Sequence, residues 1–223
     1  MIKAVIFDLD GTLVHFKIDY KNAREQVKNY LTRLGVPEEY MLNQPIFTAL
    51  EQAIRYLKSR KTSESEVNRI KEDINKIVSQ FELKAANETF LTPNAKETLS
   101  EVKRLGVKIG LFTINNRQVT EIVLNKTGIK KFFNIIVSRD DTSAIKPDDE
   151  HLLTVTRKLG VEPEQSVVVG DTVYDFQAAK RLGALTIGVE GLYDATYLKN
   201  EGKVDYVVKD LSEIINIINR FII

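Results

Sequence analysis

The feature that most constrains the fold is an alternation of short apolar runs with amphipathic segments over residues 91–221. The runs are short and rich in β-branched residues, so we predict strands there rather than helices. Their approximate positions are residues 107–112, 134–137, 166–169, 185–189 and 205–208. Strands that alternate with helices indicate a parallel sheet covered on both faces. The sequence therefore predicts a doubly wound, Rossmann-like α/β core.

One further strand is expected near the N-terminus. Residues 4–7 (Ala-Val-Ile-Phe) are apolar without alternation, as a central parallel strand would be, and the run stops at Asp8. Gly11 then permits a turn. We therefore expect Asp8 to lie at the carboxyl end of a central strand.

Between about residues 18 and 88 the pattern is helical only. Residues 21–34 are rich in helix formers, and residues 46–60 place apolar side chains at helical spacing. Ser63 and Glu66 form a possible capping box at the start of a long amphipathic helix. This segment is predicted to be all-helical.

The helical segment interrupts the α/β pattern, which predicts two domains. We expect an α/β core of residues 1–16 and 90–223, with a helical domain of residues 17–89 inserted into it. Thr92 and Pro93 are a favourable N-cap and first-turn pair, so the core's next helix is expected to begin there.

Composition excludes several classes of function. Lys and Arg total 32 against 31 Asp and Glu, so no strong field favours nucleic acid or a membrane surface. The chain has no cysteine, which excludes thiolate metal sites and cysteine catalysis. Asp8 interrupts the first apolar run too early for a signal peptide, and no stretch approaches the ~20 apolar residues of a membrane span. A cytoplasmic protein is expected.

Carboxylates follow two of the predicted strands. Asp8 and Asp10 come directly after the first, while Asp171 follows residues 166–169 and Asp175 lies four residues further on. Ligands of open parallel sheets bind beyond the carboxyl ends of the strands. Crowded carboxylates repel unless a cation or protons compensate them, and oxygen ligands without cysteine favour Mg²⁺. Each aspartate could instead serve a turn or complement a helix dipole.

Two more polar residues have the chemistry of phosphate binding. Thr113 follows the strand at 107–112 and could donate to a phosphate oxygen, or it could cap the next helix. Asn115 or Asn116 could be that cap instead. Lys146 precedes a helix and could neutralise a phosphoryl oxygen, or it could be a solvated surface lysine.

Taken together, these elements resemble the haloacid dehalogenase superfamily. The motifs are Asp8-x-Asp10-Gly11-Thr12, Thr113, Lys146-Pro147 and Gly170-Asp171-x-x-x-Asp175. The stretch from Gly170 to Val189 is similar to phosphoglycolate phosphatase-like members, and the helical segment resembles the family's helical cap. Ile114 departs from the pattern, because relatives of this type often have Asn after the Thr.

The resemblance implies a role for each motif residue. Asp8 would be the nucleophile that forms an aspartyl-phosphate, and Asp10 the acid and base. Thr113 and Lys146 would hold the phosphoryl oxygens. Mg²⁺ would be bound by Asp8, the backbone carbonyl of Asp10 and Asp171, and supported by the remaining motif residues Asp175, Gly11 and Thr12. The implied activity is Mg²⁺-dependent hydrolysis of a small phosphorylated metabolite, a phosphomonoester.

Other reactions remain open at this stage. A dehalogenase would give Asp10 and Asp171 no purpose. A phosphomutase of the β-phosphoglucomutase type would use the same residues. A receiver-like phosphorylated binding protein also clusters Asp, Thr and Lys around Mg²⁺ but lacks a helical insert. Selectivity would come from the cap, with Tyr20, Tyr40 and Arg55 as candidates. His15 and Phe16 could line the entrance, but a plain structural role is the favoured interpretation.

Overall fold

Six strands form one parallel sheet in the order β5-β4-β1-β6-β7-β8 in the computed structural model, which describes residues 1–41 and 45–222. The strands are β1 (Ala4–Phe7), β4 (Lys108–Phe112), β5 (Ile135–Val137), β6 (Ser166–Gly170), β7 (Leu185–Val189) and β8 (Tyr206–Val208). This arrangement confirms the predicted doubly wound α/β core.

Strand β1 lies in the middle because every side chain in it can be buried. Phe7 stands opposite Leu111 of β4 on one side and Val169 of β6 on the other. All four residues of β1 are buried, which is why the run is apolar throughout and does not alternate.

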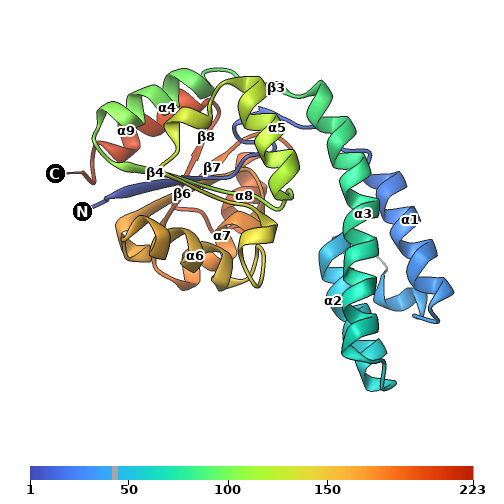
Figure 1. The fold of residues 1–223 in the computed structure, drawn as a ribbon. Helices are drawn as coiled ribbons and strands as arrows, with labels where there is room; N and C mark the ends of the chain where they lie inside the picture. Colours follow the sequence, from blue (N-terminus) through green and yellow to red (C-terminus); the bar gives the residue numbers. More distant parts are fainter. Residues whose placement is uncertain (42–44, 223) are drawn as a thin grey trace. The chain divides into compact units, whose positions relative to one another are not determined.

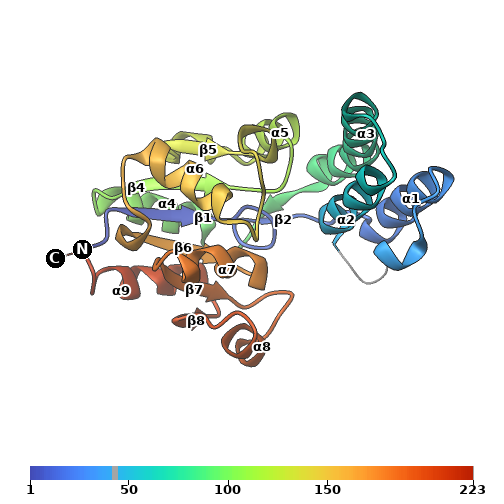
Figure 2. The same ribbon diagram turned by 90° about the horizontal axis from the view of Figure 1, so that it is seen from below.

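Helices cover both faces of the sheet (Figures 1 and 2). Helices α4, α5 and α9 lie on one face, and α6 and α7 on the other. A short helix, α8, packs against β8. The helices are α4 (Ala95–Arg104), α5 (Arg117–Thr127), α6 (Asp149–Leu159), α7 (Val173–Arg181), α8 (Ala195–Asn200) and α9 (Ile214–Ile218).

The strand order reverses between β1 and β6. From β1 the chain moves to β4 and then β5, and it returns across the sheet to β6, β7 and β8. Such a switch point leaves a crevice at the carboxyl ends of the two strands where the order reverses, and ligands bind there in open α/β sheets. Asp8 and Asp171 follow those two strands.

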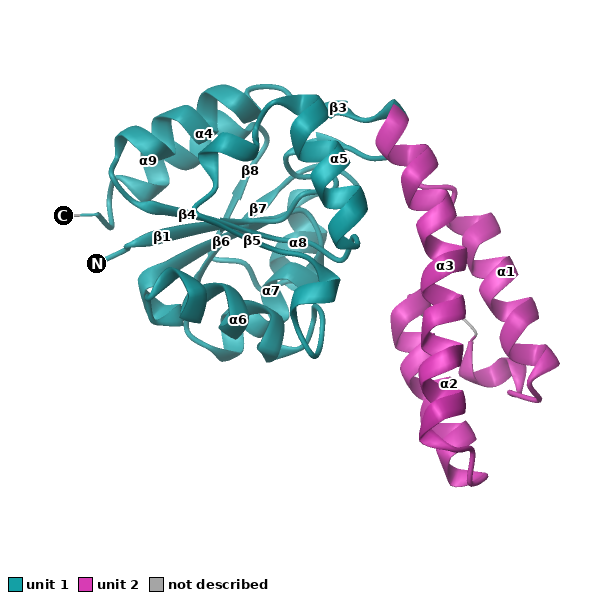
Figure 3. Ribbon diagram, viewed as in Figure 1, with its two compact units in different colours: residues 1–16, 88–223 teal, residues 17–87 magenta. Residues whose placement is uncertain are grey.

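The remaining residues, 17–87, form a separate helical unit, and residues 1–16 and 88–223 form the α/β unit (Figure 3). Residues 88 and 89, which the sequence analysis gives to the cap, belong to the α/β unit. The helical unit has three described helices, α1 (Tyr20–Arg33), α2 (Ile46–Ser59) and α3 (Glu64–Glu88), of which only the last residue of α3 falls in the α/β unit. None of the helices in the described ranges is both long enough and apolar enough to cross a bilayer.

The helical unit has a core of its own. Leu31 of α1, Ala53 of α2 and Ile74 of α3 are all fully buried in one apolar cluster. The predicted capping box at the start of α3 is confirmed, since the Glu66 amide donates to the Ser63 hydroxyl and the Ser63 amide to the Glu66 carboxylate.

One local prediction is wrong, and one small element was not predicted. Thr92 does not cap α4, which begins at Ala95 after Asn94; the Thr92 hydroxyl donates instead to the Thr12 carbonyl oxygen at 2.8 Å. That bond helps to hold a two-stranded ribbon of β2 (Val14–His15) and β3 (Phe90–Leu91), which the sequence analysis missed. Strands of two residues have too little periodicity to be recognised.

We expect the substitution Gly110→Ala to destabilise the α/β unit. A Cβ atom at Gly110 in β4 would lie 2.8 Å from Val155 Cγ1 and 3.1 Å from a methyl carbon of Leu159, both on α6. Helix α6 would have to move away from the sheet, at a cost of about 1–3 kcal/mol. Urea denaturation followed by circular dichroism would measure the loss, and an unchanged midpoint would contradict it.

Candidate active site

The turn after β1 carries the first pair of carboxylates. Asp8 is buried, and its backbone amide donates to the Val169 carbonyl oxygen at 2.9 Å, which continues the pairing with β6. Gly11 has a φ of 81°, and a Cβ atom there would lie 2.2 Å from Asp171 Oδ2. Only glycine therefore allows the turn to approach the second carboxylate so closely.

The turn after β6 carries the second pair. Asp175, in the first turn of α7, accepts from both the amide and the hydroxyl of Thr172, at 2.9 and 2.8 Å. The Thr12 hydroxyl lies 3.3 Å from Asp171 Oδ1 and donates to it. Asp175 thus takes part in the capping box of its own helix and also points into the site. Its role at the helix terminus does not exclude a role in the site.

Lys146 joins the two turns. Its ammonium group donates to Asp8 and, at 2.6 Å, to Asp175, and it lies 4.2 Å from the centroid of the Phe112 ring. The side chain is only 5% exposed, so Lys146 is not a solvated surface lysine. The backbone amide of Lys146 donates to the buried His151 ring at 3.2 Å, which holds the lysine segment against α6.

Burial and mutual repulsion dominate the electrostatics of the cluster. Burial raises the pKa of Asp8 to about 7, although Lys146 opposes the shift. Burial, with the charges of Asp8 and Asp175, raises the pKa of Asp171 to about 8. The two carboxylates raise the pKa of Lys146 above its usual value, although burial alone would lower it. The lysine therefore stays charged, and the carboxylates need a further positive charge or protons.

Thr113 lies one residue beyond β4, the strand next to β1. It is fully buried, and its hydroxyl accepts from the Asn115 amide at 3.2 Å. The helix cap is Asn116, whose side chain accepts from the Val119 amide at 2.8 Å. This confirms the alternative in which Thr113 is not the cap, and its hydroxyl hydrogen can point to a ligand.

One residue of the site was missed. The Asn115 side-chain amide donates to both carboxylate oxygens of Asp10, at 3.0 and 2.8 Å. From the sequence, Asn115 was a candidate only for the helix cap. The signal in the sequence was Ile114, because relatives often have Asn at this position. In this chain the next residue, Asn115, supplies the side-chain amide instead.

Three of the aspartates from the predicted motifs bring carboxylate oxygens together. Asp8, Asp171 and Asp175 each offer an oxygen, and these oxygens lie within 4.8 Å of one another. The Asp10 carboxylate is outside that group and faces Asn115. A contribution of Asp10 through its backbone carbonyl, as the resemblance implies, stays a prediction. Asp175 therefore moves from a supporting position into the cluster.

This donor set fits Mg²⁺. All three carboxylates are buried, they offer only oxygen, and one ammonium group, that of Lys146, contacts two of them. Three carboxylates and one ammonium leave two negative charges in a buried place, which one divalent cation would neutralise.

A hollow of about 580 Å³ opens beside the cluster at the carboxyl ends of the strands. Asp10, Gly11 and Asp171 line it, together with His15 and Phe16. The expectation that His15 and Phe16 line an entrance agrees with this position. A ligand held by the carboxylates would have room for the rest of its structure within the α/β unit.

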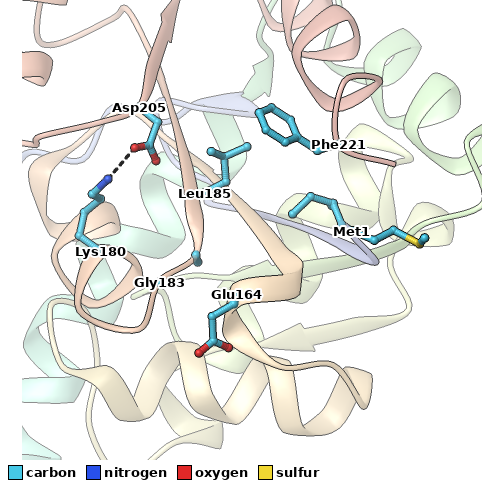
Figure 4. Close-up of a pocket in the computed structure, with 9 residues that line it drawn as sticks. Met1, Glu164, Lys180, Gly183, Leu185, Asp205 and Phe221 are labelled. Atoms are coloured by element: carbon cyan, nitrogen blue, oxygen red, sulfur yellow. Dashed lines mark hydrogen bonds and ion pairs between the residues drawn. The ribbon is translucent and has the colours of Figure 1, made fainter. Parts of the chain in front are cut away.

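A second hollow lies at the opposite edge, by the amino ends of β1, β7 and β8 (Figure 4). Met1, Leu185 and Phe221 give it apolar walls, and Lys180 pairs with Asp205 at 2.6 Å. The Lys180 and Asp205 charges in this hollow neutralise each other, whereas the carboxylate cluster has excess negative charge. The candidate active site is therefore the one at the carboxyl edge of the sheet.

The three candidates for selectivity in the helical unit have contacts within that unit. The Tyr20 hydroxyl accepts from the Ile46 amide at 2.8 Å, at the start of α2. The rings of Tyr40 and Tyr56 lie 5.2 Å apart. Arg55 pairs weakly with Glu51 at 3.9 Å on the exposed face of α2. Their predicted role in selectivity stays a prediction.

Comparison with known proteins agrees with this geometry. The model of the haloacid dehalogenase-like hydrolases matches residues 5–189. The chain belongs to this family. The predicted membership is confirmed, and the receiver-domain alternative loses its support. The match begins in β1 and ends with β7, so it includes every motif residue of the site and the helical unit.

Relatives of this hydrolase are named as phosphatases. The pyrophosphatase PpaX of Oceanobacillus iheyensis is 30% identical over 220 residues, which cover 97% of each chain. A phosphoglycolate phosphatase of Salmonella typhi is 28% identical and covers 91% of this chain and 84% of its own. The structure of a phosphatase of the family from Thermococcus onnurineus has a TM-score of 0.60 at 25% identity, covering 97% of this chain and 98% of that one.

We expect the metal-free hydrolase to lose stability between about pH 6.5 and pH 8. The pKa values of Asp8 and Asp171 are raised in the folded state, to about 7 and about 8, so the folded chain binds more protons than the unfolded chain in this range. Burial lowers the pKa of His151 to about 3 from its ordinary value of 6.5. This histidine therefore makes stability rise with pH, but only below about pH 6.5, so it does not oppose the fall above that pH. Thermal melts in EDTA would show the fall, and a flat profile would contradict it.

The same repulsion predicts that Asp171→Asn stabilises the metal-free protein at pH 8. The substitution removes one like charge and keeps an acceptor for Thr12, for a gain of roughly 1 kcal/mol. Asp205→Asn is the matched control with the opposite sign. Asp205 accepts from Lys180 and Thr186, so its neutralisation should cost about 1–2 kcal/mol. A loss of stability in both variants would show that Asp171 is not under repulsion.

Proposed function

We propose that the chain is a Mg²⁺-dependent phosphatase that hydrolyses a small-molecule phosphomonoester through an aspartyl-phosphate on Asp8. The observation that carries the proposal is the position of Asp8, which is buried at the carboxyl end of the central strand, contacts Lys146 and forms a carboxylate cluster with Asp171 and Asp175. A dehalogenase would have no need of that cluster, because it requires no metal.

The first step is phosphoryl transfer to Asp8. A carboxylate oxygen of Asp8 forms a bond to phosphorus while the bond from phosphorus to the leaving oxygen breaks. Lys146 already donates to Asp8 and has a charged group to offer to a phosphoryl oxygen. The Thr113 hydroxyl, free of the helix cap, donates to another.

Asp10 handles the proton in both steps. It donates a proton to the leaving alkoxide in the first step. In the second step it takes a proton from a water molecule, whose oxygen attacks phosphorus and releases Asp8 and inorganic phosphate. Splitting hydrolysis in this way allows one carboxyl group to serve as acid and then as base.

Mg²⁺ would be held by Asp8 and Asp171, with Asp175 and the Asp10 carbonyl oxygen as further candidates. When bound, it supplies positive charge that reduces the repulsion between a carboxylate nucleophile and an anionic substrate. The protein's own part is to keep the carboxylates buried and close together, which the turn at Gly11 and the capping box at Thr172 accomplish.

The substrate is proposed to be a small phosphorylated metabolite. Phosphoglycolate and pyrophosphate, named for the relatives, are both small and carry a second anionic group. Both belong in the first panel of substrates, together with sugar phosphates. Conversion of a sugar phosphate to its isomer without release of phosphate would indicate the phosphomutase alternative instead.

We expect Asp8→Asn to abolish turnover. The amide has the shape of the carboxylate but cannot form the acyl phosphate, so kcat for p-nitrophenyl phosphate with Mg²⁺ should fall about a thousandfold or more. Rapid acid quench and mass spectrometry should detect phosphorylated wild-type protein and no phosphorylated variant. EDTA should abolish wild-type activity, and added Mg²⁺ should restore it.

Asp205→Asn serves as the control because Asp205 lies at the opposite edge of the sheet and should leave kcat unchanged. Wild-type rates in Asp8→Asn would overturn the proposed mechanism. Full activity of the native protein in EDTA would overturn the proposed metal.

A further inference from the structure

The carboxylate of the proposed acid and base, Asp10, is not one of the three in the carboxylate cluster. Its side chain is half-buried, and the oxygens of the cluster come from Asp8, Asp171 and Asp175. A general acid must keep its proton within hydrogen-bond reach of the leaving oxygen. Some group must therefore fix the direction of the Asp10 carboxylate.

The side-chain amide of Asn115 has the geometry to do this. Its nitrogen lies 3.0 Å from one carboxylate oxygen of Asp10 and 2.8 Å from the other. Asn115 is 2% exposed, so water does not compete strongly for the amide. A donor shared by both oxygens restricts rotation of the carboxylate more than a single bond would.

The backbone around Asn115 is held as firmly as its side chain. The Arg139 amide donates to the Asn115 carbonyl oxygen at 3.1 Å, and the Arg139 guanidinium donates to the Ile114 carbonyl oxygen at 2.8 Å. The Asn115 amide donates to Thr113, whose own amide donates to the Val137 carbonyl oxygen at 3.0 Å. Ile114 is 38% exposed, so the turn directs that residue outward.

We propose that Asn115 is a positioning residue that orients Asp10 for proton transfer to the leaving group. The inference rests on the proposed phosphatase function. Asn115 acts through Asp10 and takes no part in bond making. Arg139 is 8% exposed and lies just after β5, the strand next to β4. It fixes the loop that carries Asn115.

The test separates positioning of an acid from a general structural effect. A misplaced Asp10 should lower the rate most for substrates with basic leaving groups, because these groups depend on protonation as their bond to phosphorus breaks. The value of kcat/KM reports events up to the first irreversible step, which includes phosphoryl transfer to Asp8. We would measure kcat/KM in the presence of Mg²⁺ for p-nitrophenyl phosphate and for phenyl phosphate. Phenolate is the more basic of the two leaving groups.

Asn115→Asp and Asn116→Asp form a matched pair one residue apart. Both replace an amide by a carboxylate of the same size and add the same charge. Asn115→Asp removes the donor to Asp10, whereas Asn116→Asp keeps an acceptor for the Val119 amide and thus keeps the cap of α5. Asn115→Ala adds a variant that removes the donor without adding charge.

We expect both Asn115 variants to lose about tenfold more activity on phenyl phosphate than on p-nitrophenyl phosphate, part of the 10²–10⁴-fold that general acid catalysis supplies. The ratio of the two activities in Asn116→Asp should stay within about twofold of wild type, the size of an indirect effect. Equal losses on both esters in the Asn115 variants, or an equal change of ratio in Asn116→Asp, would overturn the assignment.

Two further outcomes are distinguishable. Unfolding of both Asn115 variants in thermal melts would overturn the inference, since it would show that Asn115 acts on the fold. Absence of phosphate release by the unsubstituted protein from either ester, from phosphoglycolate and from pyrophosphate would overturn the proposed function itself, and this inference with it. A normal wild type with equal losses in the variants overturns the role of Asn115 alone.

Discussion

The ion pairs of the buried Lys146 ammonium with Asp8 and Asp175 are the contacts on which the site depends. They join the end of the central strand, the segment after β5 and the first turn of α7. A buried charge left without its partner costs about 3–5 kcal/mol, so these three segments can approach one another only if the lysine lies between them. The Phe112 ring, 4.2 Å from the ammonium, adds a cation–π contact on the side away from water.

The lysine compensates only part of the negative charge of the carboxylate cluster. The remaining charge lowers the stability of the folded protein, although the same charge serves its function. Asp171 lies close to Asp8 and Asp175 with its pKa raised to about 8, and it packs against Gly11, where no Cβ atom could fit. Like charges held together by the fold represent stored free energy, and natural proteins accept such a cost at active sites. A divalent cation offsets that cost, and it also lowers the barrier for an anion to approach Asp8.

Much of the fold follows from local pattern, and so does most of the site. The strands that carry Asp8, Thr113 and Asp171 were recognisable because buried parallel strands are short, apolar and β-branched. The helical unit was recognisable from periodicity alone. Thr92 was wrongly assigned as a helix cap from propensity, whereas its hydroxyl donates to the Thr12 carbonyl oxygen, far away in the chain. Asn115 was missed for the same reason, because its orientation depends on Arg139.

The sequence by itself determined the class of fold, the helical insertion, and which polar residues stand at the ends of strands, because periodicity and turn chemistry are local properties. It also determined that no thiolate can be a metal ligand, because the chain has no cysteine. Only the tertiary structure decided that Asp175 rather than the Asp10 carboxylate joins the cluster, that Lys146 is buried, and that Asn115 faces Asp10. Those outcomes depend on distances between segments that are separate in the chain, by 138 residues for Lys146 and Asp8 and by 105 for Asn115 and Asp10. No local pattern encodes such distances.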